Sequence, residues 1–320
     1  MTVKGPISGS LPTLVNGEPV GSLPVTDRGL AYGDGVFETL RITASGPVLY
    51  TEHLQRLAAS CQRLHIPLDL MQVHRHIEQL LNTRALLFSG EFDTGIIKLI
   101  VTRGDGGRGY MPPVSVQPRI IVQWHPLPSD LAQPAEQGIV CALIDQPVSL
   151  NPQLAGMKHL NRLDQVLASQ VMQRLVEYRP QLREVLMPDP YGWLIEGSRS
   201  NIFAVFEGQL CTPDLSHAGV AGVMRQHLLQ AAREAGKPGC IRPIGVSELT
   251  LASEVFICNS VIGVWPVHEL WSGARAETPL AAWTRHPRAR WAQGLFDTCL
   301  SSGRLSLPAG AEIQRPDSLS

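Results

Sequence analysis

Hydrophobic and polar positions follow two different spacings along the first 126 residues. Alternating runs rich in β-branched and aromatic residues predict strands in VFETLRI (36–42), GIIKLIVTRG (95–104) and PRIIVQWHPL (118–127). Apolar residues recur at helical spacing over 52–64 and again over 70–86. This part of the chain is therefore expected to combine a sheet with two helices.

The rest of the chain mixes strands and helices in the same way. Short apolar runs predict strands near 138–145, 183–188, 192–196, 201–206 and 254–258. Helices are predicted for the segment that begins AGMKHLNRLDQVL at Ala155, for about 222–235, and within 281–300. The expected fold class is α/β (α+β).

A Pro-rich polar stretch, HPLPSDLAQPAEQ, lies between the two sets of elements and is typical of a domain boundary. It predicts an N-terminal α/β lobe over 1–125, of which 1–12 form a loose extension, and a linker over 126–136. A C-terminal α/β lobe then covers 137–320, and its last part, 279–320, is an extra tail with a polar end.

Composition narrows the class of protein. The 320 residues carry a formal net charge of −1, which gives no reason to expect nucleic acid or an anionic membrane as a partner. No apolar stretch is long enough for a signal peptide or a membrane span. The six cysteines and ten histidines show no metal-ligand spacing, so no metal site is predicted. A reducing, cytoplasmic compartment is the expectation.

Lysine is rare, and four of the 27 Lys and Arg residues are lysines. An apolar stripe at helical spacing (Leu160, Leu163, Leu167, Val171) places Lys158 at or just before the first turn of a helix. The positive end of the helix macrodipole disfavours a cation there, so the pKa of the amine is expected to fall toward the range that a Schiff-base lysine needs. Simple exposure to water is the alternative that position alone leaves open.

Glu196 ends the apolar run GWLIEG, so its carboxylate is expected to be at least partly buried. A buried carboxylate needs a cationic or hydrogen-bonding partner. The protonated ring nitrogen of pyridoxal phosphate is one such partner. An internal salt bridge with Arg199 or another arginine is the alternative.

Two further segments suggest anion binding. Gly219 and Gly222 stand directly before a predicted helix, where the backbone N–H groups of Val223 and Met224 could hold a phosphate. Asn259, at the end of the strand in FICNS, offers a hydrogen-bonding side chain that could add to this site or cap a turn.

The glycine-rich loop TRGDGGRGY (102–110) lacks the lysine pattern of a nucleotide-binding loop. It offers Arg103, Arg108 and Tyr110, which suit a substrate that carries carboxylates. A plain solvent-exposed loop is the alternative.

These segments occur in an order that resembles one family. DRGLAYGDGVFETLRI, HLQRL, RGDGGRGY, AGMKHLNRLDQVL, EGSRSNIF, GVAGVMRQ and EVFICNS together are similar to the fold-type IV pyridoxal-phosphate enzymes, over about 14–270. That family includes branched-chain and D-amino-acid aminotransferases and the 4-amino-4-deoxychorismate lyases. The lysine segment and the glycine-rich loop look most like those of the lyases, whereas GVFE with Glu38 also occurs in the transaminases.

The resemblance implies a two-lobed fold with pyridoxal 5′-phosphate in the cleft between the lobes. Lys158 would bind the cofactor covalently and later move the substrate proton, and Glu196 would pair with the pyridine nitrogen. The cofactor phosphate would be bound by Arg56, by the backbone of Val223 and Met224, and by the side chain of Asn259. Thr39 would assist proton transfer, and Arg108 and Tyr110 would face the substrate carboxylates.

The implied activity is elimination from 4-amino-4-deoxychorismate to give 4-aminobenzoate and pyruvate, a step of folate synthesis. A D-amino-acid or branched-chain aminotransferase on the same fold is the first alternative. A catalytically silent binding protein is the second, and the joint presence of Lys158, Glu196 and Arg56 argues against it. The resemblance also implies a homodimer.

Overall fold

The computed structural model describes residues 13–87, 94–273 and 276–307. The chain forms two compact units: the first contains residues up to Leu127 together with the segment that begins at Ser302, and the second is Pro128–Ser301. The mixture of helices and strands confirms the expected α/β class. A cofactor cleft between two lobes stays a prediction.

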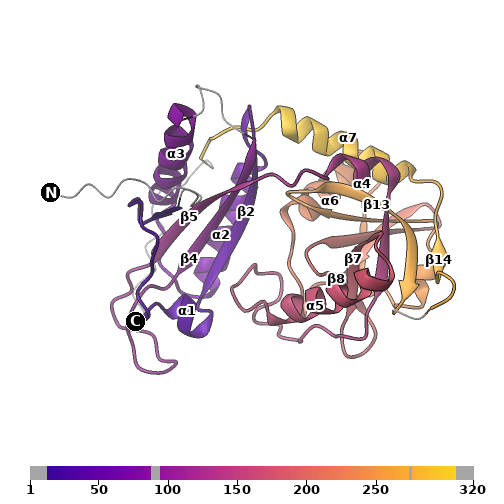
Figure 1. Ribbon diagram of the computed structural model, residues 1–320, viewed down its shortest axis with the longest axis horizontal. Helices are drawn as coiled ribbons and strands as arrows, with labels where there is room; N and C mark the ends of the chain where they lie inside the picture. The colour runs from indigo at the N-terminus through magenta and orange to yellow at the C-terminus, as the bar shows by residue number, and fades with distance from the viewer. Residues whose placement is uncertain (1–12, 88–93, 274–275, 308–320) are drawn as a thin grey trace. The chain divides into compact units, whose positions relative to one another are not determined.

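The first unit is built on a five-stranded antiparallel sheet in the order β1-β5-β4-β2-β3. Its strands are β1 (Thr13–Val15), β2 (Gly35–Thr43), β3 (Gly46–Pro47), β4 (Gly95–Thr102) and β5 (Arg119–Pro126). The helices are α1 (Arg28–Tyr32), α2 (Tyr50–Arg63) and α3 (Leu70–Leu87) (Figure 1). The long strands and both long helices confirm the elements predicted for this region.

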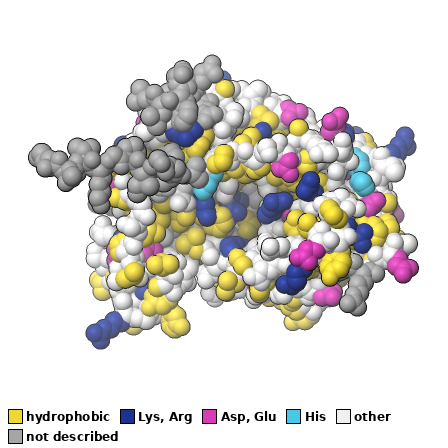
Figure 2. All heavy atoms as spheres, in the orientation of Figure 1, with side chains coloured by type: hydrophobic (Ala, Val, Ile, Leu, Met, Phe, Trp, Pro, Cys, Tyr) yellow, Lys and Arg dark blue, Asp and Glu magenta, His cyan; other side chains and the backbone are white. Residues whose placement is uncertain are grey.

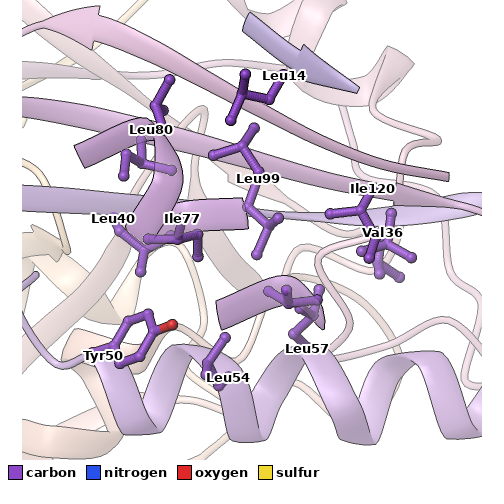
Figure 3. Packing of buried hydrophobic residues seen from close by; sticks show 14 of the residues in the cluster. Leu14, Val36, Leu40, Tyr50, Leu54, Leu57, Ile77, Leu80, Leu99 and Ile120 are labelled. Carbon is purple, nitrogen blue, oxygen red and sulfur yellow. The ribbon is translucent and has the colours of Figure 1, made fainter. Parts of the chain in front are cut away.

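Helices α2 and α3 cover one face of this sheet. Leu54 from α2 and Ile77 from α3 meet Leu40 and Leu99 from the strands, and all four side chains are fully buried (Figure 3). Along β2, buried positions alternate with half-buried ones, as expected for a strand covered by helices on one face. The apolar positions at helical spacing and the alternating apolar positions of the strands therefore pack against each other in one core.

The end of the described chain completes this core. Residues 302–307, here called the C-terminal strap, belong to the first unit, and Leu305 and Leu307 pack against its hydrophobic cluster. A Cβ on Gly303 would lie 2.8 Å from the carbonyl oxygen of Gly46, so the two backbones touch at a point where only glycine fits. The sequence pattern predicts this segment as part of the second lobe, whereas in the structure it belongs to the first unit.

The second unit is built on a nine-stranded sheet in the order β11-β10-β9-β12-β13-β6-β7-β8, with β14 paired to β13. Strand β6 pairs in parallel with both β13 and β7, β10 pairs in parallel with β11, and the other pairs are antiparallel. The strands are β6 (Ile139–Leu143), β7 (Leu182–Pro188), β8 (Leu194–Gly197), β9 (Asn201–Phe206), β10 (Gln209–Pro213), β11 (Cys240–Arg242), β12 (Glu254–Asn259), β13 (Gly263–Ser272) and β14 (Ala281–Ala282).

The central strands of this sheet are buried on both faces. In β6, Ile139 and Cys141 belong to one hydrophobic cluster, while Val140 and Ala142 belong to another. Such strands appear in a sequence as continuous apolar runs rather than as alternation. This explains why several of them were predicted from short apolar runs alone.

The helices of the second unit differ from the predicted ones in two places. They are α4 (Ala132–Gln137), α5 (Leu163–Tyr178), α6 (Val223–Glu234), a 3₁₀ turn η1 (Glu248–Leu251) and α7 (Pro287–Ser301). Helix α4 lies in the stretch predicted as a linker, and α5 begins at Leu163 instead of near Ala155. Helices α6 and α7 lie where the sequence predicts them.

Strand β13 is long and central, but the sequence analysis does not predict it. Pro266 stands in its middle, and proline argues against a central strand because it cannot donate a ladder hydrogen bond. In the structure Pro266 pairs with Phe256 on one side, and pairing with β6 on the other side starts only at Val267.

The surface fits the small net charge. On the face shown in Figure 2, acidic and basic side chains are interspersed with hydrophobic ones. A search of the described helices finds none with the length and apolar content of a membrane span. In the part of the chain that the structure describes, no three His, Cys, Asp or Glu side chains are grouped to bind a metal ion.

Candidate active site

Lys158 lies in the loop between β6 and α5, five residues before the helix begins. The helix-dipole argument for a low amine pKa is therefore wrong, because such effects fade within the first turn of a helix. The predicted apolar stripe is wrong at two of its four positions: Leu163 is 74% and Leu167 42% exposed, whereas Val171 packs against a hydrophobic cluster. The buried side chains of α5 are Ala168 and Leu175.

Two sets of hydrogen bonds shape the Lys158 loop. Gly156 donates to the carbonyl oxygen of Gly219 (2.9 Å), and Ala221 donates to the carbonyl oxygen of Gly156 (3.0 Å). On the other side of the lysine, the guanidinium group of Arg162 donates from Nη2 to the Met157 carbonyl (2.6 Å) and from Nε to the His159 carbonyl (2.9 Å). The backbone on both sides of Lys158 is thus fixed to its surroundings.

Glu196 ends β8 and is buried, as predicted. Its Oε1 accepts from Gln165 Nε2 (3.0 Å), and its Oε2 accepts from the backbone N–H of Val220 (2.8 Å). Burial raises the pKa of this carboxyl group, although the Val220 N–H, the charges of Arg162 and Lys158 and the Gln165 hydrogen bond all oppose the rise.

The alternative partner of Glu196 is not found. Arg199 Nε lies 4.0 Å from Glu184, and within the described residues Glu196 forms no ion pair within 4.0 Å. Glu184 is itself buried and accepts hydrogen bonds from the hydroxyl groups of Ser198 (2.5 Å) and Ser200 (2.8 Å). The serines of the turn after Glu196 are therefore bound by Glu184 and not by Glu196. Among the described residues, no cation contacts the buried carboxyl group of Glu196.

The loop before α6 is tied to the hairpin that carries Glu196. Asn201 Nδ2 donates to the Val220 carbonyl (2.8 Å), while Glu196 accepts from the Val220 N–H. A Cβ on Gly222 would lie 2.0 Å from Asn201 Oδ1, so only glycine fits there. No side chain caps α6, whose first two residues are Val223 and Met224. Their N–H groups lie at the helix N-terminus, where a phosphate binds favourably.

Asn259 is held by its own turn. Its Oδ1 accepts from the N–H groups of Val261 (2.8 Å) and Ile262 (2.9 Å), and its Nδ2 donates to the Arg199 carbonyl (3.0 Å). The side chain therefore caps the turn between β12 and β13. Its contact with a cofactor phosphate stays a prediction that would use the remaining N–H.

A pocket of about 240 Å³ opens beside the Lys158 loop. Its walls include His159, Arg162, Gln165 and Gly219. Among the described residues, His159 Nδ1 and Gln165 Oε1 are buried polar atoms without a hydrogen-bond partner. Burial, with help from the nearby Arg162, lowers the pKa of His159 to about 4, so this ring is neutral near pH 7. The pocket has the polar groups to receive a ligand.

The first unit contains a second buried carboxylate, Glu38. It accepts from Arg56 Nε (2.8 Å), from Arg56 Nη2 (2.5 Å) and from His53 Nδ1 (2.6 Å). Burial acts to raise the pKa of Glu38, but Arg56 and His53 outweigh it and lower the pKa to about 2. Arg56, predicted to bind phosphate, is thereby held rigidly on α2. Thr39 follows Glu38 in β2 and points to the opposite face of the sheet.

The glycine-rich loop is organised by an arginine that the sequence analysis did not single out. Arg28 is buried, and its guanidinium group donates to the carbonyl oxygens of Gly106, Gly109, Tyr110 and Met111 at 2.9–3.3 Å. Arg28 lies in DRGLAYGDG, one of the segments that carry the family resemblance. Nothing in that segment indicates that its side chain contacts a loop about 80 residues away in the sequence.

Three side chains of this loop are predicted to suit a substrate, and the prediction is wrong for Arg103. It is buried, binds Asp34 through Nε (2.8 Å) and Nη2 (3.0 Å), and donates to the carbonyls of Leu64 and His65. Arg103 thus closes the end of α2 against the sheet. Arg108 and Tyr110 are exposed, as a substrate contact requires, and their role stays a prediction.

The amino-transferase class IV family model matches residues 35–270, about three quarters of the chain. The chain belongs to this family. The match confirms the resemblance drawn from the seven sequence segments, and it ends before α7 and the C-terminal strap. Lys158 and Glu196 both lie within the matched range.

Three class IV relatives sharpen the comparison. Aminodeoxychorismate lyase from Vibrio harveyi is 29% identical over 253 residues, which covers 79% of this chain and 89% of the relative. A putative branched-chain-amino-acid aminotransferase from Methanocaldococcus jannaschii is 32% identical, with 77% and 82% covered. The crystal structure of 4-amino-4-deoxychorismate lyase from Pseudomonas aeruginosa is 40% identical, has a TM-score of 0.77, and covers 90% of this chain and 99% of its own.

Proposed function

We propose that the protein is a pyridoxal-phosphate-dependent aminodeoxychorismate lyase, which converts 4-amino-4-deoxychorismate to 4-aminobenzoate and pyruvate. The observation that carries the proposal is Glu196, a buried carboxylate beside the loop of Lys158. Two neutral donors bind it, and among the described residues no cation contacts it. An acid group in this state suits a ligand that brings its own positive charge.

The residues fit pyridoxal 5′-phosphate. Glu196 would pair with the protonated ring nitrogen, and the amine of Lys158 would bind the aldehyde carbon. The N–H groups of Val223 and Met224 would bind the phosphate at the uncapped start of α6, joined by Arg56 and Asn259. When bound, this cofactor withdraws electrons from the carbon next to the substrate amine.

The chain's own groups then carry the reaction. Lys158 takes the proton from the ring carbon that bears the substrate amine. The enolpyruvyl group leaves with the electron pair of its carbon–oxygen bond, and the ring becomes aromatic. Because aromatisation makes the elimination strongly downhill, the protein mainly positions groups and stabilises negative charge. Thr39 would assist the proton transfer, and Arg108 and Tyr110 would bind the substrate carboxylates.

Incubation of the purified protein with 4-amino-4-deoxychorismate tests the activity. We expect equal amounts of 4-aminobenzoate and pyruvate from the wild type, and a rate at least 10²-fold lower from Lys158→Ala. Borohydride reduction followed by peptide mapping should place the cofactor on the peptide that contains Lys158. A protein that traps cofactor but forms neither product contradicts the lyase, and one that traps none contradicts the whole assignment.

An aminotransferase is the second candidate, and the 32% identity to the Methanocaldococcus protein favours it. Both activities use the same lysine and cofactor. A half-reaction separates them: mixing the cofactor-loaded protein with D-alanine or L-leucine converts a transaminase to its amine form, with a visible spectral change. We expect no such change on the timescale of 4-aminobenzoate formation.

The proposed assembly is a homodimer. Helix α5 exposes Leu163, Val166 and Leu167 at helical spacing, and an exposed apolar stripe of this kind favours association. Size-exclusion chromatography with light scattering should give twice the chain mass of 34.9 kDa. A monomer would contradict this part of the proposal.

The proposed compartment is the cytoplasm, and the proposed pathway is folate biosynthesis. The six cysteines all lie in the part of the chain that the structure describes and form no disulfide there, as a reducing compartment favours. Folate synthesis requires 4-aminobenzoate, so a cell that lacks this protein should need added 4-aminobenzoate to grow.

A further inference from the structure

One short segment supports both groups on which the proposed function depends. Lys158, Arg162 and Gln165 occupy positions 1, 5 and 8 of KHLNRLDQ, and they span the end of the loop and the start of α5. We infer that Arg162 and Gln165 are positioning residues for the proposed reaction. Arg162 fixes the backbone around Lys158, and Gln165 fixes the carboxylate of Glu196. The inference rests on the proposed function, because it assigns a purpose to contacts around that site.

Arg162 acts on the peptide groups around the lysine. Its Nη2 and Nε bind the carbonyl oxygens of Met157 and His159, which are the residues directly before and after Lys158. The planar guanidinium group presents donors in a fixed fork, so two carbonyls bound to it keep a set separation. The Lys158 backbone between them cannot rotate without breaking one of these bonds. Lys158 lies before the start of α5, so helical hydrogen bonds do not fix its backbone, and the Arg162 contacts take their place.

Gln165 acts on the carboxylate. It donates from Nε2 to Glu196 Oε1, while the other oxygen of Glu196 is bound by the Val220 N–H. One neutral donor on each oxygen fixes the plane of the carboxylate. Gln165 belongs to the first turn of α5, so the helix that follows the Lys158 loop sets the direction of Glu196.

Arg162 also joins the two halves of this arrangement. Its charge acts on the carboxyl group of Glu196 and opposes the rise in pKa that burial causes. A glutamine or a lysine at position 162 would therefore have different consequences. Lysine keeps the positive charge, but its single ammonium group cannot reproduce the fixed pair of donors of the guanidinium group.

Gln165→Met tests the carboxylate contact, since methionine has a similar length and no donor. We expect the dissociation constant for pyridoxal phosphate to rise about tenfold, which is about 1.4 kcal/mol. We also expect the pH at which the visible spectrum of the bound cofactor changes to move by at least half a unit, because Glu196 sets the charge of the ring nitrogen. Gln170→Met, at an exposed position of the same helix, should change neither quantity.

Arg162→Lys tests the backbone contact. We expect added pyridoxal phosphate to bind Lys158 at least tenfold more slowly, followed by absorbance and by borohydride trapping, and kcat to fall more than KM rises. The spectral pH should move little, because the positive charge is kept. Arg174→Lys, an exposed arginine on α5, is the matched control.

The outcomes separate the two proposals. If wild-type protein traps no cofactor on Lys158, the proposed function fails. If the wild type traps cofactor and the two variants match their controls in affinity, trapping rate and spectral pH, the function stands and the positioning roles are overturned. Thermal unfolding of each cofactor-free variant accompanies these measurements. A variant that has lost its fold is replaced by Gln165→Glu or Arg162→Gln, for which the same readouts decide.

Discussion

Glu38 in the first unit and Glu196 in the second are both buried, and their carboxylates have opposite surroundings. Glu38 contacts Arg56 and His53, which lower its pKa to about 2, so it is charged and compensated. Glu196 contacts an amide and a backbone N–H, and burial raises its pKa. The pair teaches that burial alone does not mark a functional acid. Glu196 differs from Glu38 in that the described protein supplies hydrogen bonds to it but no cation in contact. Glu254 is also buried and bound by backbone N–H groups, so Glu196 is marked in addition by its place beside the Lys158 loop.

Removing the cation from Glu38 should have the largest effect on stability. Arg56→Met leaves a buried charge without its main partner, so the free energy of unfolding should fall by about 3–5 kcal/mol. Urea unfolding of the cofactor-free protein measures this. Arg63→Met, at an exposed position of the same helix, should stay within about 0.5 kcal/mol of the wild type. Equal stabilities of the two variants would contradict the idea that Arg56 compensates Glu38.

Neutralising the two carboxylates should separate them. Glu38→Gln loses a charge whose pKa is lowered from 4.5 to about 2, and should destabilise the cofactor-free protein by about 3 kcal/mol at pH 7. Glu196→Gln removes a buried charge that lacks a cation in contact, and the Gln165 amide can turn to accept from the new one. Its unfolding free energy should therefore be unchanged or higher, within about 1 kcal/mol, although lyase activity should fall at least 10²-fold. Similar losses of stability in both variants would remove the distinction.

The pH dependence of stability should have opposite signs at the two sites. Because the folded pKa of Glu38 lies below its unfolded value, its stabilisation is present above about pH 4.5 and is lost as pH falls toward 2. The gap between wild type and Glu38→Gln should shrink to about half by pH 3. Because the folded pKa of Glu196 is raised, ionisation costs the cofactor-free protein stability as pH rises through that pKa. Wild type should then fall behind Glu196→Gln as pH increases, and parallel curves would be the contrary result.

An exposed cation should give the smallest effect. Arg108→Ala should change the free energy of unfolding by less than about 0.5 kcal/mol, because the side chain is exposed. If Arg108 binds a substrate carboxylate, KM should rise about tenfold while kcat changes little, which is about 1.4 kcal/mol of binding. Arg285→Ala, at another exposed position, should change neither constant. An unchanged KM would remove Arg108 from the substrate site.

The sequence predicted most elements whose pattern is local. The alternation in β2 and the helical spacing in α2 survive in the structure, because one face of each buries the same core. Strand β13 was not predicted because Pro266 lacks the N–H group that a central strand normally needs. In the structure, Pro266 pairs only with β12, and the pairing with β6 begins at Val267. The start of α5 was predicted too early, because leucines that read as a core face are in fact exposed.

Site residues divide along the same line. An ordered set of motifs predicts Lys158 and Glu196 as site residues, and their roles stay predictions. The helix-dipole reason for Lys158 is wrong, because the lysine lies outside the helix. Arg28, Gln165 and Glu184 were missed because each acts on a group far away in the sequence or on the backbone. Hydrogen bonds from a side chain to a distant carbonyl leave no periodic trace, so only coordinates reveal them.

The C-terminal strap has a consequence for how the protein is made. The second unit is one continuous stretch, Pro128–Ser301, but the first needs residues from both sides of it. As the chain leaves the ribosome, the second unit can fold as soon as it is complete, since domains generally fold as units during synthesis. Leu305 and Leu307 can pack against the hydrophobic cluster of the first unit only after they have been translated. The first unit is thus begun first and completed last. A chain that stops at Ser301 would lack the side chains of Leu305 and Leu307 that pack against the hydrophobic cluster of the first unit.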